Sequence, residues 1–135
     1  MADGSSLKCV VVTPERAVLD EPADFVVVPM TDGELGVAQD RLPMIGRLGF
    51  GELRVVKGNQ TLSYYVDGGF VQIRGNVVTV LTSKAIPSKD IKTAAAQDVL
   101  RSAKTESTPE AQDAQQKAQQ RARAQLRIAQ KQSQN

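Results

Sequence analysis

The sequence lacks several of the residues on which enzymes and metal sites most often depend. Its 135 residues include no histidine and a single cysteine, Cys9. Without histidine, the side chain best suited to proton transfer near neutral pH and the commonest metal ligand are both missing. Cys9 has no partner for a disulfide, and because it lies in the apolar run from Leu7 to Val12 we expect it to be buried and unreactive. We therefore expect no catalytic residues, no bound cofactor and no metal.

Long apolar segments are missing as well. No run approaches the length of about 18 residues that a membrane-spanning helix requires, and nothing resembles a signal peptide. We expect a soluble chain, large enough for one core and a small appendage, that meets a membrane only through a partner.

The character of the chain changes near Pro87. Residues 1–87 contain all five aromatic residues and carry a net charge of −2, whereas residues 88–135 contain no aromatic residue and carry a net charge of +4. We therefore expect two parts, residues 1–87 and residues 88–135. The second part would meet an acidic partner more readily than the first.

Short strands separated by turns fill the first part. Apolar and β-branched runs predict strands at Leu7–Thr13, Ala17–Leu19, Asp24–Met30, Glu52–Lys57, Gln60–Val66, Gly69–Arg74 and Val77–Thr82. Gly58-Asn59 and Gly75-Asn76 are two-residue hairpin turns. Four glycines and Pro43 predict an irregular segment from Leu35 to Gly51. So many short strands favour a sandwich or a barrel.

Two helices are expected after Pro87. Ser88 or Asp90 would cap the first, which runs to about Lys104. A spacing of four residues predicts a single apolar face made of Ile91, Ala95, Val99 and Ala103.

The second helix is expected to begin at Thr108-Pro109-Glu110 and to run to about Lys131. Its predicted apolar face consists of Ala111, Ala114, Ala118, Ala122, Leu126 and Ala129. A buried alanine methyl contributes about 0.8 kcal/mol, against roughly 1.5–3 kcal/mol for a leucine. The helix is therefore expected to dock weakly and to stay helical when it leaves its docking site.

Two local patterns have both a chemical and a structural interpretation. Asp32 and Glu34 are paired carboxylates, but they flank Gly33 in a predicted turn, which favours a solvated turn or a polar contact with a partner. The glycine-rich stretches at residues 46–51 and 67–69 lack the lysine and the strand–helix context of a phosphate loop. Turns and bulges explain them better.

Basic residues gather in the second predicted helix, at Lys117, Arg121, Arg123, Arg127 and Lys131. They fit a solvated face that interacts favourably with the C-terminal end of the helix. They also fit contact with an acidic protein. Binding to nucleic acid is a third interpretation, less favoured because the first part is acidic and the tail offers no aromatic residue on which a base could stack.

In order along the chain, several motifs resemble the epsilon subunit of F-type ATP synthases, the equivalent of mitochondrial delta. These are the opening Val10–Arg16, the turn Asp32-Gly33-Glu34-Leu35-Gly36-Val37, the segment from Pro43 to Leu53, the pair Gly68-Gly69-Phe70-Val71 and Asn76–Leu81, and the closing Ala124-Gln125-Leu126-Arg127-Ile128. The resemblance covers nearly the whole chain.

This resemblance implies a ten-stranded β-sandwich followed by an antiparallel two-helix hairpin. It implies a non-catalytic subunit of the rotating central stalk that binds gamma, rests on the c-ring and thereby couples the ring to gamma. It further implies a peripheral membrane protein on the cytoplasmic face of a bacterial inner membrane. The ring and stalk contacts would include Asp32, Glu34 and Arg41.

The resemblance also implies that the helices extend into the catalytic head and suppress ATP hydrolysis. The contacts with acidic segments of the beta subunits would then be made by Lys117, Arg121, Arg123 and Arg127.

The chain departs from the family pattern in two motifs. Arg41 stands where the family usually has the histidine of Gly-His-Ala-Pro. Some bacterial members bind ATP through an acid and an arginine at the start of the first helix, where this chain has Lys92 and Ala95. We therefore expect no ATP binding.

Two other functions remain open from the sequence. A β-barrel that binds nucleic acid through its basic helical tail would lose affinity steeply with salt. An ATP-sensing module would gain thermal stability when ATP is added.

Overall fold

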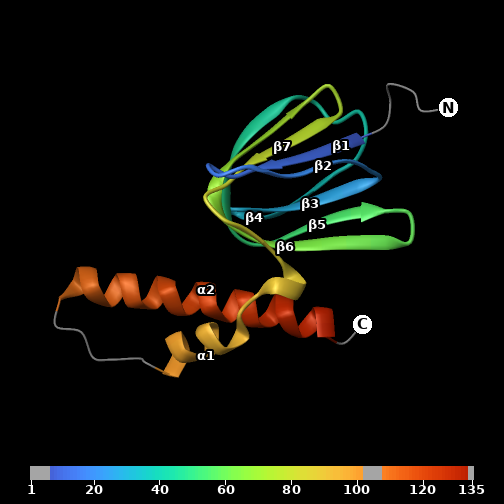
Figure 1. Ribbon diagram of the computed structural model, residues 1–135. Coiled ribbons are helices and arrows are strands. Elements are labelled where there is room, and N and C mark those ends of the chain that lie inside the picture. The colour runs from blue at the N-terminus through green and yellow to red at the C-terminus, as the bar shows by residue number, and fades with distance from the viewer. Residues whose placement is uncertain (1–6, 102–107, 134–135) are drawn as a thin grey trace.

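The computed structural model describes residues 7–101 and 108–133, which form a strand-rich part followed by helices (Figure 1). The strands are β1 (Leu7–Val12), β2 (Ala17–Ala23), β3 (Phe25–Met30), β4 (Gly33–Val37), β5 (Met44–Lys57), β6 (Gln60–Arg74), β7 (Val77–Leu81) and β8 (Ala85–Pro87). After them come a 3-10 helix, η1 (Ser88–Asp90), and two α-helices, α1 (Thr93–Arg101) and α2 (Pro109–Ser133).

The strands form two layers that share the long hairpin of β5 and β6. One layer contains β2, β1 and β7, with the end of β6 and the start of β5. The other contains β4 and β3, with the end of β5, the start of β6 and β8. The predicted sandwich is therefore confirmed. The described residues form eight continuous strands, and the expected ten are obtained when β5 and β6 are each counted once in each layer.

Apolar side chains from both layers meet in one core. The layer containing β1 contributes Cys9, Val11, Val78 and Val80, and the layer containing β3 contributes Val26, Val28, Leu53 and Val55. Cys9 is fully buried, as the sequence predicts, and burial raises the pKa of its thiol to about 12. It is therefore uncharged and unreactive at neutral pH.

The segment from Leu35 to Gly51 is not irregular, contrary to the sequence prediction. Most of it belongs to β4 and β5, because β5 is hydrogen-bonded to β3 on one side and to β6 on the other. The glycines of this segment allow β5 to bend from one layer into the other without ending.

A glycine of β6 is needed at the same bend. Gly69, opposite Leu48 of β5, has a φ of 113°, and a Cβ there would meet the carbonyl oxygen of Leu81 in β7. Gly69 is therefore needed for this close approach of β6 and β7.

Helix α1 begins later than expected and buries a different face. It starts at Thr93, after η1 and the extended residue Ile91. Ile91 consequently lies outside the helical period, and the predicted face is wrong: Ala95 and Val99 are exposed, whereas Ala96 is buried. The predicted end at Lys104 and the face residue Ala103 lie outside the described residues.

Helix α2 begins where the sequence predicts. The backbone N–H of Ala111 donates to Thr108 Oγ1 at 3.1 Å, which confirms Thr108 as the cap. Of its predicted apolar face, Ala122 is buried but Ala114 and Ala118 are exposed. Ala124 and Ile128, which the prediction omitted, are also buried. A helix that packs on two neighbours needs two apolar faces, and the single predicted stripe left out the two buried residues that pack on the sandwich.

The two helices lie together on one side of the sandwich, with α2 next to the strands (Figure 1). Among the described residues, no helix is both long enough and apolar enough to span a membrane.

Candidate interface between the sandwich and the helical hairpin

Helix α2 rests on the sandwich where β5 and β6 bend. Tyr65 of β6, Ile91 before α1, and Ala124 and Ile128 of α2 form a small buried cluster separate from the main core. Phe50, Ile86 and Ala129 pack around it. The contact is apolar but small, in keeping with the predicted weak docking.

Tyr65 lies at the centre of this cluster and is fully buried. Its hydroxyl donates to Asp67 Oδ2 at 3.1 Å. Burial and the neighbouring carboxylate raise the pKa of Tyr65 far above its ordinary value, so the hydroxyl remains a proton donor at all physiological pH values.

Arg121 of α2 contacts both strands of the bent hairpin, β6 through Asp67 and β5 through Phe50. Its Nε donates to Asp67 at 3.0 Å, and its guanidinium carbon lies 5.3 Å from the centre of the Phe50 ring. A cation over an aromatic ring contributes about 0.5–1 kcal/mol at an exposed site. Arg121 therefore adds directional contacts to a mostly apolar interface.

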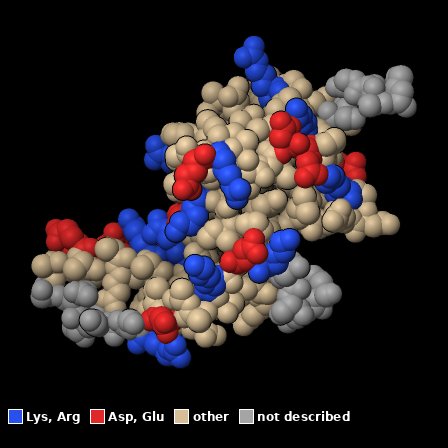
Figure 2. Space-filling view, in the orientation of Figure 1, with Lys and Arg blue, Asp and Glu red and all other residues tan. Residues whose placement is uncertain are grey.

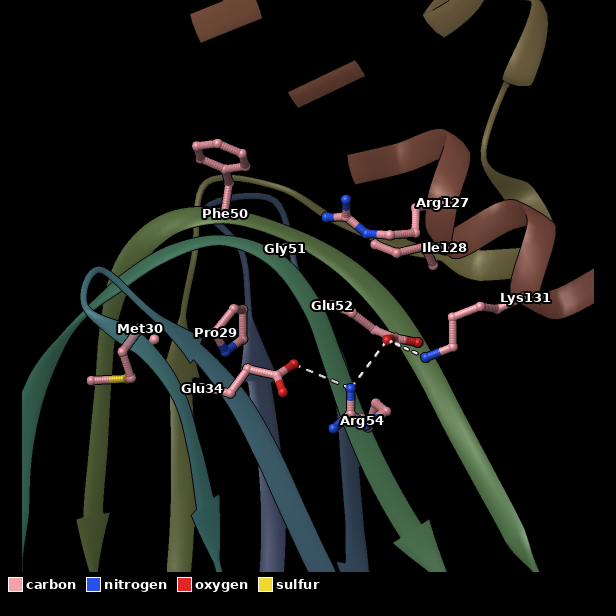
Figure 3. Close-up of a pocket in the computed structure, with 11 residues that line it drawn as sticks. Pro29, Met30, Glu34, Phe50, Gly51, Glu52, Arg54, Arg127, Ile128 and Lys131 are labelled. Atoms are coloured by element: carbon pink, nitrogen blue, oxygen red, sulfur yellow. Dashed lines mark hydrogen bonds and ion pairs between the residues drawn. The ribbon is translucent and has the colours of Figure 1, made fainter. Parts of the chain in front are cut away.

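A second charged contact lies about three turns further along α2 and extends into the sandwich (Figure 3). Lys131 Nζ lies 2.8 Å from Glu52 Oε1, and Ser63 Oγ donates to Glu52 Oε2 at 2.6 Å. Burial alone would raise the pKa of Glu52, but the hydrogen bonds from Lys131 and Ser63 outweigh it and hold this pKa below its ordinary value. Glu52 is therefore a carboxylate at neutral pH.

Arg54 joins Glu52 to the β3–β4 turn. Its Nη1 is 3.2 Å from Glu52 Oε1 and 3.2 Å from Glu34 Oε2. Neighbouring carboxylates raise its pKa despite the opposing effect of burial. We call Glu34, Arg54, Glu52 and Lys131 the ionic network.

The basic residues predicted to make inhibitory contacts are not equivalent in this structure. Arg121 contacts the sandwich, whereas Lys117 pairs with Asp113 on its own helix at 3.1 Å. Arg123 is exposed, and Arg127 lines a groove of about 380 Å³ between α2 and the sandwich. Figure 2 shows Lys and Arg side chains gathered along this boundary.

The predicted ring contacts lie at two places on the sandwich. Asp32 is exposed in the β3–β4 turn, and Glu34 is exposed beside this turn, at the start of β4. Arg41 is exposed on the loop after β4, where the neighbouring Asp40 N–H donates to Asn76 Oδ1 of the β6–β7 turn at 2.7 Å. Glu34 pairs with Arg54 of β5 instead of Arg41.

Several interface residues were missed by sequence reasoning, namely Phe50, Glu52, Arg54, Tyr65 and Asp67. Those on the strands carry no local signal, because only the fold brings them to α2. Helix α2 did carry a local signal in its sequence. The spacing places four of its interface residues on one helix face, namely Arg121, Ala124, Ile128 and Lys131.

Lys92 and Ala95, at the positions that differ from the ATP-binding pattern, are both exposed near the start of α1. Neither supplies a carboxylate or a guanidinium.

Comparison with known proteins gives the family. Residues 6–88 match the family model of the ATP synthase delta/epsilon chain, beta-sandwich domain. The chain belongs to the ATP synthase delta/epsilon family. It is 50% identical to the ATP synthase epsilon chain of Rhodopirellula baltica over 126 residues, which are 92% of this chain and 98% of that relative. It is 34% identical to the epsilon chain of Rubrobacter xylanophilus, over 82% of this chain and 77% of the relative.

Solved structures share the fold. A chain from the Tetrahymena thermophila mitochondrial ATP synthase central stalk and c-ring superposes with a TM-score of 0.71 at 14% identity, over 91% of this chain and 96% of that one. A chain from the Euglena gracilis mitochondrial ATP synthase superposes with a TM-score of 0.68 at 20% identity, over 93% and 78%. The predicted family, its two-part fold and the role of an ATP synthase epsilon subunit are thus confirmed.

Proposed function

We propose that the sandwich binds gamma and rests on the c-ring in the central stalk, while the hairpin restrains ATP hydrolysis when it leaves the sandwich. The observation that carries this proposal is the 50% identity to an ATP synthase epsilon chain across both parts of the chain. The subunit has no active site of its own and is a peripheral component on the cytoplasmic face of a bacterial membrane. In the part of the chain that the structure describes, no specific contact supports nucleic-acid binding or ATP sensing.

The gamma-binding surface is the outer face of the layer that contains β7. Large apolar side chains point outward there, with Ile45 73% exposed and Phe70 50% exposed. Leu81, also exposed, lies directly beside Phe70 in the register of β6 and β7. Exposed aliphatic and aromatic residues that lie together on one face are typical of a protein–protein interface.

The ring contact is assigned to the charged turn and loop at Asp32, Glu34 and Arg41. All three residues are exposed, so polar loops of a partner can reach them, although Glu34 also pairs with Arg54. Charged groups at the rim of an interface contribute mainly to orientation and to the rate of association.

Binding of purified gamma to the full-length chain tests the proposal. Replacing Ile45 and Phe70 together by serine should weaken binding roughly tenfold or more, because buried aromatic and aliphatic anchors carry most of the energy of an interface. The matched control is Val99→Ser, which alters an exposed apolar residue of α1 outside this face. Wild-type affinity of the double variant, or failure of the wild-type chain to bind gamma, would contradict the proposal.

A further inference from the structure

The ionic network joins the β3–β4 turn to helix α2 through shared atoms. A single nitrogen, Nη1 of Arg54, contacts both Glu34 and Glu52. A single oxygen, Oε1 of Glu52, contacts both Arg54 and Lys131. The four charged groups therefore form one continuous chain of alternating sign, from Glu34 through Arg54 and Glu52 to Lys131 (Figure 3).

The middle of the network is shielded from water and its ends are open. The side chains of Glu52 and Arg54 are 12% and 28% exposed, whereas Glu34 and Lys131 are more than half exposed. Charges act on one another more strongly where water is excluded. A change of charge at Glu34 consequently alters the interaction between Arg54 and Glu52 as well as the surface ion pair between Glu34 and Arg54.

We propose that this network couples the β3–β4 turn to hairpin docking, so that a cationic group of a partner bound to Glu34 weakens the docking of α2 on the sandwich. When Glu34 is neutralised, Arg54 interacts with Glu52 alone. Lys131 then meets a more fully compensated carboxylate and binds it less strongly. By linkage, docking of the hairpin lowers the affinity of Glu34 for the cation by the same factor.

The proposal rests on the proposed function only for the identity of the partner, the ring that faces this turn. The coupling itself is a property of the isolated chain. Failure of the coupling and failure of gamma or ring binding are therefore separate results.

The coupling predicts opposite effects from the two partners of one ion pair. Glu34→Gln should loosen docking, because Arg54 then compensates Glu52 more fully. Arg54→Gln should tighten it, because Lys131 then meets two uncompensated carboxylates. If the pair merely held the turn in place, both substitutions would act in the same direction.

Thiol reactivity of the full-length isolated chain measures docking. Ala124 is buried against the sandwich, so Ala124→Cys reacts with a maleimide only when α2 leaves its docking site. Its rate is divided by that of Ala118→Cys, an exposed position on the same helix, and the buried native Cys9 should stay unlabelled.

We expect Glu34→Gln to accelerate labelling about two- to fivefold and Arg54→Gln to slow it by a similar factor, as for partly exposed ion pairs. The matched control Asp32→Asn removes an exposed carboxylate of the same turn that lies outside the network, and should leave the rate unchanged. Equal rates for Glu34→Gln and Asp32→Asn would overturn the proposal, as would faster labelling in both Glu34→Gln and Arg54→Gln.

A double-mutant cycle tests the pathway directly. In a Lys131→Gln background, Glu34→Gln should no longer change the labelling rate. An undiminished effect there would show that Glu34 acts on the hairpin by another route and would also overturn the proposal.

Discussion

Arg121 differs from the other three predicted inhibitory residues because it already contacts the sandwich, as Lys131 does at Glu52. Its guanidinium contacts Asp67 and lies over Phe50 while the hairpin is docked. Its ion pair with Asp67 therefore has to break before Arg121 can form the same kind of pair with another protein. Lys117, Arg123 and Arg127, by contrast, are exposed in the docked arrangement. Any test of inhibition has to separate the residue that holds the hairpin down from those that do not.

At the scale of a single residue, the geometry around Gly69 predicts that a side chain there destabilises the fold. Gly69→Ala places a methyl group against the carbonyl oxygen of Leu81, in a backbone conformation that side chains rarely adopt. We expect the free energy of unfolding to fall by about 2–4 kcal/mol, measured by urea denaturation.

Gly58→Ala is the matched control for this substitution. Gly58 also has a positive φ, of 60°, but no atom lies within 4 Å of its added Cβ. Its cost should be only about 1 kcal/mol, from the backbone alone. Equal costs at the two positions would show that the close approach to Leu81 has no energetic consequence.

At the scale of elements, α2 carries two packing faces, and this limits what its sequence predicts. Its cap at Thr108 and its length were predictable, because capping and propensity are local. Its buried residues were not: Ala122 belongs to the predicted stripe, but Ala124 and Ile128 pack on the sandwich. The same reason explains β5, where bonding to β3 and β6 overrides the glycines that predicted a loop.

Ile128 is the principal apolar anchor of α2 on the sandwich. Ile128→Ala should weaken docking by about 2–4 kcal/mol, because it removes most of a buried side chain. Small-angle X-ray scattering should then report a larger radius of gyration while the strand signal in circular dichroism is unchanged. Val99→Ala, at an exposed position of α1, should leave the scattering curve unaltered. A compact Ile128→Ala variant would indicate that charged contacts alone hold the hairpin.

At the scale of the whole molecule, the chain consists of a sandwich with its own core and a hairpin attached through a much smaller cluster. The core draws on both layers and includes no residue of α1 or α2. The two hairpin turns and most of the strand positions were predictable from the sequence, but β4, β8 and the first part of β5 were not. The sites at which α2 docks were not predictable either, since they join residues far apart in the chain, such as Asp67 with Arg121 and Glu52 with Lys131.

The separation of the two cores predicts that the sandwich folds alone. A chain truncated after Pro87 should keep its strand signal in circular dichroism and elute as a monomer in gel filtration, although Tyr65 and Phe50 lose their cover. Loss of the strand signal would show that the hairpin is part of the folding unit, and would contradict the division at residues 87 and 88.

We propose that one hairpin both docks on the sandwich and restrains the catalytic head. The most direct test is ATP hydrolysis by the reconstituted complex carrying Lys117→Ala, Arg123→Ala and Arg127→Ala together. This variant keeps the Arg121–Asp67 pair and the helix propensity of α2. We expect hydrolysis to rise severalfold at low salt, the difference from wild type to narrow as salt screens the charges, and binding to gamma to be unchanged. Equal hydrolysis rates at low and moderate salt would contradict the proposal.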